Sequence, residues 1–91
     1  MMYKLRPSTK FQKDVKRMKK RGADMEALNH VLKILAEGKE LAPKYRNHTL
    51  SGNFANCQEC HIMADWLLIY EIHDRELYLY LVRTGSHSDL F

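Results

Sequence analysis

The sequence predicts an α+β fold in which two N-terminal helices pack on an antiparallel sheet of about four strands. Apolar residues recur with helical spacing in the first half of the chain, and short strand-like runs of apolar residues follow in the second half. The 91 residues are 45% hydrophobic and 29% charged, which suits one small folded domain over residues 1–91 and is too apolar for intrinsic disorder.

The first half begins with a short candidate strand and continues with two helices. Residues 2–6 favour an extended segment that ends at Pro7, because proline cannot donate to a strand ladder. An amphipathic helix is expected over residues 9–21, capped by Ser8 or Thr9, from three apolar residues at i, i+4 and i+7: Phe11, Val15 and Met18. A second apolar stripe predicts a helix from Asp24 to Gly38, and the short link favours an antiparallel pair of helices.

The second half is predicted to form strands. Residues 39–53 show no period, and an irregular stretch of this length in a compact domain is often functional. Three strands are expected after it, over residues 58–64, 66–72 and 76–83. Because short links join them, an antiparallel meander with both helices on one face is favoured.

The charge is distributed unevenly along the chain. Residues 1–23 carry nine Lys and Arg against one acid, a balance of +8, whereas the remaining 68 residues sum to −4. Such a basic block suggests attraction to a polyanion, and a solvated lysine-rich helix face is the alternative. No apolar run approaches the roughly 20 residues of a membrane span, and the N-terminal residues lack the apolar core of a secretory signal. A cytoplasmic protein is therefore expected.

Cys57 and Cys60 have the spacing of half a zinc site. Tetrahedral zinc usually takes four ligands from two such pairs, and the sequence holds no second pair. If the segment is a strand, residues three apart also point to opposite faces. We therefore expect no metal site and no cofactor.

Histidines and charged residues form a second candidate site. His61 and Asp65 share a face near the end of one predicted strand, while His48 and His87 lie in the two least regular segments. Arg83 ends a strand after an apolar row formed by Leu77, Leu79 and Leu81. Brought together, these groups could cleave RNA by transesterification without a metal. A base would take the 2′-hydroxyl proton, an acid would protonate the leaving 5′-oxygen, and cations would stabilise the phosphate.

Three motifs in this order resemble those of the YafQ toxins, a family within the RelE/ParE superfamily of bacterial toxin–antitoxin systems. Residues 61–70, His-Ile-Met-Ala-Asp-Trp-Leu-Leu-Ile-Tyr, resemble the family signature H-x-x-x-D-W-L-L-I-Y. Residues 48–52 resemble its H-x-L-x-G loop. Residues 83–87 and the final Leu90-Phe91 resemble its R-T-G-[ST]-H motif and terminal L-F.

The resemblance implies a type II toxin that acts as a ribosome-dependent endoribonuclease and cuts mRNA in the A site by metal-independent acid–base chemistry. The catalytic set that it implies is His48, His61, Asp65, Arg83 and His87. Arg83 would stabilise the phosphate, His87 would be the general acid, and Asp65, directly or through a histidine, would be the base. His48 and His61 would orient or neutralise the phosphate. Trp66 and Phe91 would match aromatic residues at or near the site. From the charge of the first helix, contacts with the RNA backbone are expected at Lys10, Lys13, Lys16 and Arg17.

The resemblance also implies partners. These are the ribosome, mRNA and a DinJ-like ribbon-helix-helix antitoxin, in a heterotetrameric complex that binds operator DNA. Two other functions stay open: a ParE-like toxin that inhibits gyrase, and an RNA-binding module without chemistry. The three histidines argue against the first, which needs no histidine cluster, and an inactive His87→Ala variant would argue against the second.

Overall fold

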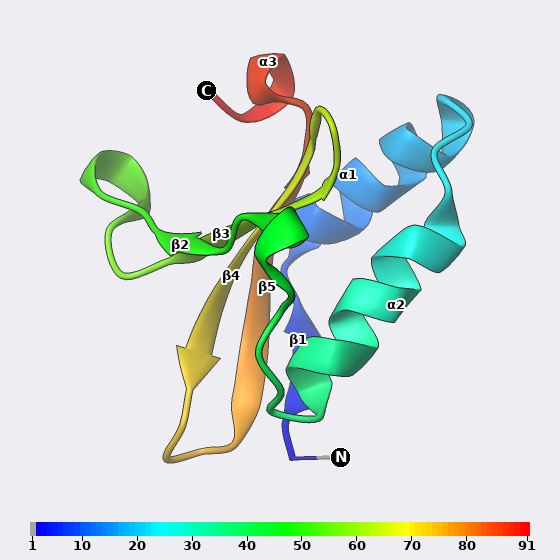
Figure 1. Cartoon of the computed structure of the whole chain (residues 1–91). Helices are drawn as coiled ribbons and strands as arrows, with labels where there is room; N and C mark the ends of the chain where they lie inside the picture. The colour runs from blue at the N-terminus through cyan, green and yellow to red at the C-terminus, as the bar shows by residue number, and fades with distance from the viewer. Residues whose placement is uncertain (1) are drawn as a thin grey trace.

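The computed structural model describes residues 2–91, which form a five-stranded sheet with two long helices on one face (Figure 1). Along the chain the elements are β1 (Lys4–Pro7), α1 (Thr9–Lys20), α2 (Met25–Ala36), η1 (Pro43–Tyr45), β2 (His48–Thr49), η2 (Gly52–Phe54), β3 (Gln58–Met63), β4 (Trp66–His73), β5 (Tyr78–Gly85) and α3 (His87–Leu90). The α+β class predicted from the sequence is confirmed. Within residues 2–91, no helix is both long and apolar enough to cross a membrane.

The sheet is mixed, in the order β1-β5-β4-β3-β2. Strands β2 to β5 form the expected antiparallel meander, but β1 pairs in parallel with β5, with Lys4 opposite Tyr78. The sheet therefore has five strands and is not purely antiparallel. Parallel pairing needs a long crossover between the strands, and nearly the whole chain lies between β1 and β5.

Side-chain caps start both long helices. The Ser8 hydroxyl accepts the Phe11 N–H at 2.9 Å, which decides between the two expected caps of α1. The Asp24 carboxylate accepts the Glu26 N–H at 3.0 Å at the start of α2. The chain turns after α1 at Gly22, which has a φ of 84°. Glycine adopts this left-handed conformation at little energetic cost because it has no Cβ.

Two apolar clusters lie on the sheet. The larger one packs α1 and α2 against β3, β4 and β5, with α1 over β5 and α2 over β3. The smaller one joins the loop before β3, the central strands and α3, and its buried members are Cys57, Leu67, Ile69 and Leu90. Cys60 belongs to the larger cluster and Cys57 to the smaller one, which agrees with their odd spacing.

Local irregularities change three side-chain positions expected from alternation. A register shift between His61 and Met63 ends the regular alternation before Asp65, which lies in the β3–β4 turn. A second shift, opposite Ile69 and Tyr70, interrupts β5 before Arg83. Leu77 is exposed at φ 55° in the β4–β5 connection, so it is not part of the apolar row of β5. The C-terminal tail is more regular than expected, because it extends β5 and then forms α3.

Candidate active site

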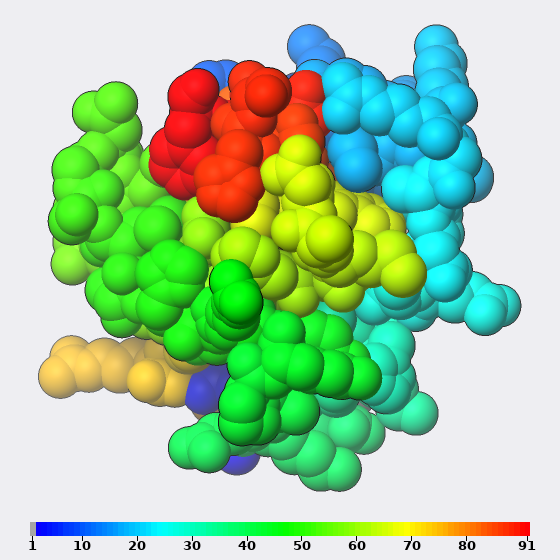
Figure 2. All heavy atoms as spheres, turned by 45° about the horizontal axis from the view of Figure 1, so that its top comes forward, coloured from blue at the N-terminus to red at the C-terminus, as the bar shows by residue number. Residues whose placement is uncertain are grey.

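Three histidines from distant parts of the chain form a row at one end of the sheet. The ring centroids of His48 and His61 are 6.5 Å apart, and those of His61 and His87 are 6.0 Å apart. The row continues through Phe91, whose centroid is 6.2 Å from that of His87, to Phe54, 5.6 Å further on. Figure 2 looks onto this end, where the red C-terminal residues, the yellow-green β3–β4 turn and the green segment before β3 lie side by side.

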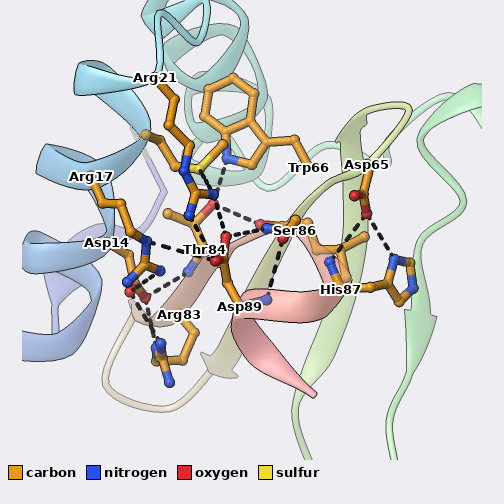
Figure 3. Close-up of polar contacts among 12 residues, drawn as sticks. Asp14, Arg17, Arg21, Asp65, Trp66, Arg83, Thr84, Ser86, His87 and Asp89 are labelled. Carbon is orange, nitrogen blue, oxygen red and sulfur yellow. Dashed lines mark hydrogen bonds and ion pairs between the residues drawn. The ribbon is translucent and has the colours of Figure 1, made fainter.

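Asp65 holds the imidazole of His87. Its Oδ1 lies 3.1 Å from both the backbone N and the ring Nδ1 of His87, as Figure 3 shows. These bonds, the backbone one first, hold the pKa of the Asp65 carboxyl below its usual range. The carboxylate is therefore a weak proton acceptor and a good orienting group. With Nδ1 turned toward Asp65, the Nε2 edge of a side chain that is 59% exposed remains for a substrate.

Glu59, which the sequence analysis did not single out, lies between the other two histidines. Its Oε1 is 3.2 Å from Nε2 of His48 and 3.7 Å from Nε2 of His61. Its side chain is only 5% exposed. A signal for Glu59 was present in the sequence, because it precedes His61 by two residues and so shares its face of β3. The pairing of β2 with β3 then sets His48 directly opposite Glu59.

His48 is held from both sides of its ring. Nδ1 lies 2.9 Å from the carbonyl oxygen of Arg46, and Nε2 faces the Glu59 carboxylate. Since both neighbours are acceptors, only the doubly protonated ring can donate to both. Arg46 presents this carbonyl from a left-handed conformation (φ 48°, ψ 46°), which is uncommon for a bulky residue. The two contacts fix the orientation of the His48 ring.

Arg83 does not face the histidine row in this structure. Its guanidinium binds the carboxylate of Asp14 in α1, through Nε at 2.6 Å and Nη2 at 3.1 Å. Asp14, 3% exposed, also accepts from Arg17 at 2.8 Å and from the backbone N–H of Thr84 at 3.1 Å. In Figure 3 Ser86 and Asp89 lie between this group and the Asp65–His87 pair. A catalytic role for Arg83 stays a prediction.

A second ion pair anchors α3, the helix that carries His87. Both terminal nitrogens of Arg21 bind the Asp89 carboxylate, at 2.6 and 2.9 Å (Figure 3). Asp89 also accepts the backbone N–H of Ser86 at 2.9 Å, which completes a capping box, and these bonds hold the pKa of Asp89 well below its usual range. A Cβ on Gly85 would lie 2.9 Å from Oδ2 of Asp89, so this approach requires glycine.

We refer to Asp14, Arg17, Arg21, Arg83 and Asp89 as the arginine–aspartate network.

The other expected substrate-binding residues lie in different environments. Trp66 is 4% exposed in the larger apolar cluster, and its indole N–H donates to the Thr84 hydroxyl at 2.9 Å. This position gives it no free face for a base, so a direct stacking role does not fit this structure. Phe91 is 63% exposed beside His87. Among the expected RNA contacts on α1, Arg17 is half-buried against Asp14, whereas the lysines are exposed: Lys10, Lys13 and Lys16.

Residues 3–91 match the family model described as the bacterial toxin of type II toxin–antitoxin system, YafQ. The chain belongs to the YafQ family. The matched range includes every candidate residue above, and the family expected from the three motifs is confirmed.

Curated and solved relatives agree with this membership. The mRNA interferase toxin YafQ of Escherichia coli (strain K12) is 35% identical over 85 residues, which cover 92% of this chain and 90% of the relative. The crystal structure of a metal-bound toxin from Helicobacter pylori is 45% identical, with a TM-score of 0.91 and 100% of both chains covered. YafQ in the E. coli DinJ–YafQ complex is 33% identical, with a TM-score of 0.89 and 98% of each chain covered.

Because one of these YafQ-like structures holds a metal, we tested whether the residues of this chain fit one. Across the part of the chain that the structure describes, no group of three His, Cys, Asp or Glu is close enough to hold a metal ion. The cysteines are buried in different clusters, and burial raises the pKa of Cys60 to about 12. The two cysteines therefore do not form a shared metal site.

Proposed function

We propose that this chain is an mRNA interferase, a ribosome-dependent endoribonuclease that cuts mRNA in the A site. The observation that carries the proposal is the histidine row, in which Asp65 holds His87 with its second ring nitrogen exposed. The name of the E. coli relative supports it. Such a toxin would act in the cytoplasm, where ribosomes translate.

The geometry supports a division of roles along the row. His61, in the centre, takes the proton of the 2′-hydroxyl, and the nearby Glu59 carboxylate stabilises the imidazolium that forms. The 2′-oxygen then attacks phosphorus, the bond to the 5′-oxygen breaks, and a 2′,3′-cyclic phosphate results. His87 gives its Nε2 proton to the leaving 5′-oxygen, so that protons balance.

His48 and Asp65 support these two proton transfers. His48, held by Glu59 and the Arg46 carbonyl, lies where it would orient the phosphate and stabilise its charge. Asp65 was expected to act as the base, but its lowered pKa and its bonds to His87 suit an orienting role better. We therefore assign the base to His61 and keep His87 as the acid.

The basic helix and the exposed C-terminal ring complete the RNA surface. Lysines on the solvent side of α1 would meet ribosomal RNA phosphates, contacts that are independent of base sequence: Lys10, Lys13 and Lys16. Phe91 lies at the end of the row, where its exposed ring could stack on a base beside the cleaved bond.

We also propose a DinJ-like antitoxin as the partner. The E. coli homologue forms a DinJ–YafQ complex, and this chain shares its fold over 98% of its length. The net charge of +4 and the exposed lysines of α1 would attract an acidic partner segment. A heterotetramer that binds operator DNA through the antitoxin is the expected assembly.

Primer extension on an mRNA in a purified translation system tests the proposed activity. We expect discrete cuts in the A site that require ribosomes and that are lost in His87→Ala. Equal cutting by His87→Ala would contradict the assignment of the acid. Absence of cutting by the wild-type chain, with translation unaffected, would contradict the nuclease itself.

A further inference from the structure

A cavity of about 860 Å³ opens beside the histidine row, between α2, η1 and the end of β3. Its size lies within the range of small-molecule sites. His61 lines both the cavity and the row, so the two share a wall. The residues that define its character are Ala27, His30, Lys44, Arg46, Ile62 and Ala64.

The lining combines an apolar floor with a cationic rim. Ile62 is a buried member of the larger apolar cluster and Ala27 packs against that cluster, so both supply uncharged surface to the lining. Lys44 and Arg46 are exposed at the rim, and Glu26 is the acid among the lining residues. A nucleotide has matching chemistry, because its base has apolar faces with polar edges and its phosphate is an anion.

The rim is tied structurally to the histidines. The ammonium of Lys44 lies over the ring of buried Tyr45, 5.1 Å from its centroid, which keeps the charge at the cavity mouth. Arg46 lines the cavity while its left-handed backbone directs its carbonyl to His48. Strained backbone of this kind is typical of functional sites, where surrounding structure holds it in place.

We propose that this cavity binds the nucleotide on the 5′ side of the cut, the one whose 2′-hydroxyl attacks. The proposal rests on the nuclease function above, in which His61 takes the proton of that hydroxyl. Since His61 forms the wall between row and cavity, the base attached to the same ribose would enter the cavity. Lys44 and Arg46 would then contact its 5′-phosphate, and the lining would select the base.

Charge reversal at the rim tests the cavity in the cleavage reaction. Lys44→Glu is compared with Lys33→Glu, which makes the same change of net charge at an exposed position of α2 outside the lining. We expect that Lys44→Glu needs about ten times more toxin than Lys33→Glu to reach half of the maximal cleavage rate. A tenfold change is the scale expected for the loss of one charge-assisted hydrogen bond. It should also broaden the base preference 5′ of the cut. Equal behaviour of both variants would overturn the proposal.

A binding measurement separates failure of the cavity from failure of the nuclease. The probe is a trinucleotide of 2′-deoxyadenosine, which lacks the attacking hydroxyl, titrated into the wild-type chain while methyl and amide NMR signals are followed. We expect shifts at Ala27, Ile62 and Ala64 that Lys44→Glu weakens and Lys33→Glu retains. If these shifts are seen but the wild-type chain does not cleave mRNA, nucleotide binding in the cavity is supported and the proposed nuclease activity is contradicted. If the wild-type chain cleaves mRNA but these shifts are absent, only the proposal of nucleotide binding in the cavity is contradicted. The same conclusion follows if Lys44→Glu changes nothing except the affinity for the antitoxin.

Discussion

The histidine row and the arginine–aspartate network use similar charged groups in opposite ways. In the network, each carboxylate has several donors, with Asp14 bound by Arg83, Arg17 and a backbone N–H. In the row, His87 has one carboxylate partner at Nδ1, and its Nε2 edge remains open to solvent. The two sites are close, since α3 carries His87 at its first residue and Asp89 two residues later.

The difference shows which charged residues are available for chemistry. Charged groups whose hydrogen bonds are all made within the protein hold the backbone in place. Removing one partner leaves the other charge buried and unpaired, which is strongly unfavourable. Groups with one partner and one free edge are oriented and can still exchange a proton. The network therefore supports the row by tying β5 and α3 to α1.

Removal of the acid should have the largest effect. We expect His87→Gln to lower the cleavage rate by about 10²- to 10⁴-fold, the usual contribution of a general acid, while the melting temperature changes little. Cleavage is measured by primer extension and stability by thermal unfolding. His73→Gln, at the far end of β4, is the matched control and should cut normally. A large drop in the cleavage rate of both variants would contradict a specific role for the histidine row.

Breaking the arginine–aspartate network should lower the stability of the fold. Asp14→Asn leaves the Arg83 guanidinium without its carboxylate, and we expect a loss of about 3 kcal/mol in the free energy of unfolding. Urea unfolding measures it, with the exposed Glu76→Gln as control. A loss no greater than that of the control would show that the network is dispensable for the fold.

The ion pair at α3 should appear in the pH dependence of stability. The pKa of Asp89 is lowered in the folded state by Arg21 and Ser86, so its contribution is present above the unfolded value, about 3.9, and is lost as pH falls below it. Asp89→Asn should therefore lose less stability than the wild-type chain between pH 6 and pH 3. Parallel curves for the two chains would contradict the assignment.

The exposed lysines should give the smallest effect on the fold. Replacing Lys10, Lys13 and Lys16 by Gln should change unfolding free energy by less than about 0.5 kcal/mol. Ribosome binding should weaken, and its logarithmic salt slope should fall by about 2 if these lysines meet phosphates. An unchanged slope would place the RNA contact elsewhere.

Much of the fold could be predicted from local sequence. The i, i+4 and i+7 spacing of Phe11, Val15 and Met18 predicted α1. The preference of hydroxyl side chains for the N-cap limited the cap to Ser8 or Thr9, and the structure shows that it is Ser8. Parallel pairing of β1 with β5 could not be predicted in this way. It depends on residues more than 70 positions apart, which no local pattern connects.

The site was predicted only in part, for a similar reason. Strand alternation and motif resemblance found the three histidines, but the partner of each depends on register and bulges. Glu59 was overlooked because its importance comes from the register that sets it opposite His48. The contact of Arg83 with Asp14 depends on how α1 lies over β5, which the sequence pattern leaves open.

The general acid role of His87 is the central claim, and a change of leaving group tests it most directly. An mRNA with sulfur in place of the bridging 5′-oxygen at the cut site needs no proton from an acid, because a thiolate leaves readily near neutral pH. Cleavage rates of this mRNA and of the ordinary one are compared for the wild-type chain and His87→Ala. The account predicts that His87→Ala, strongly impaired on the ordinary mRNA, cuts the sulfur-containing mRNA at nearly the wild-type rate. An equal impairment on both mRNAs would contradict it.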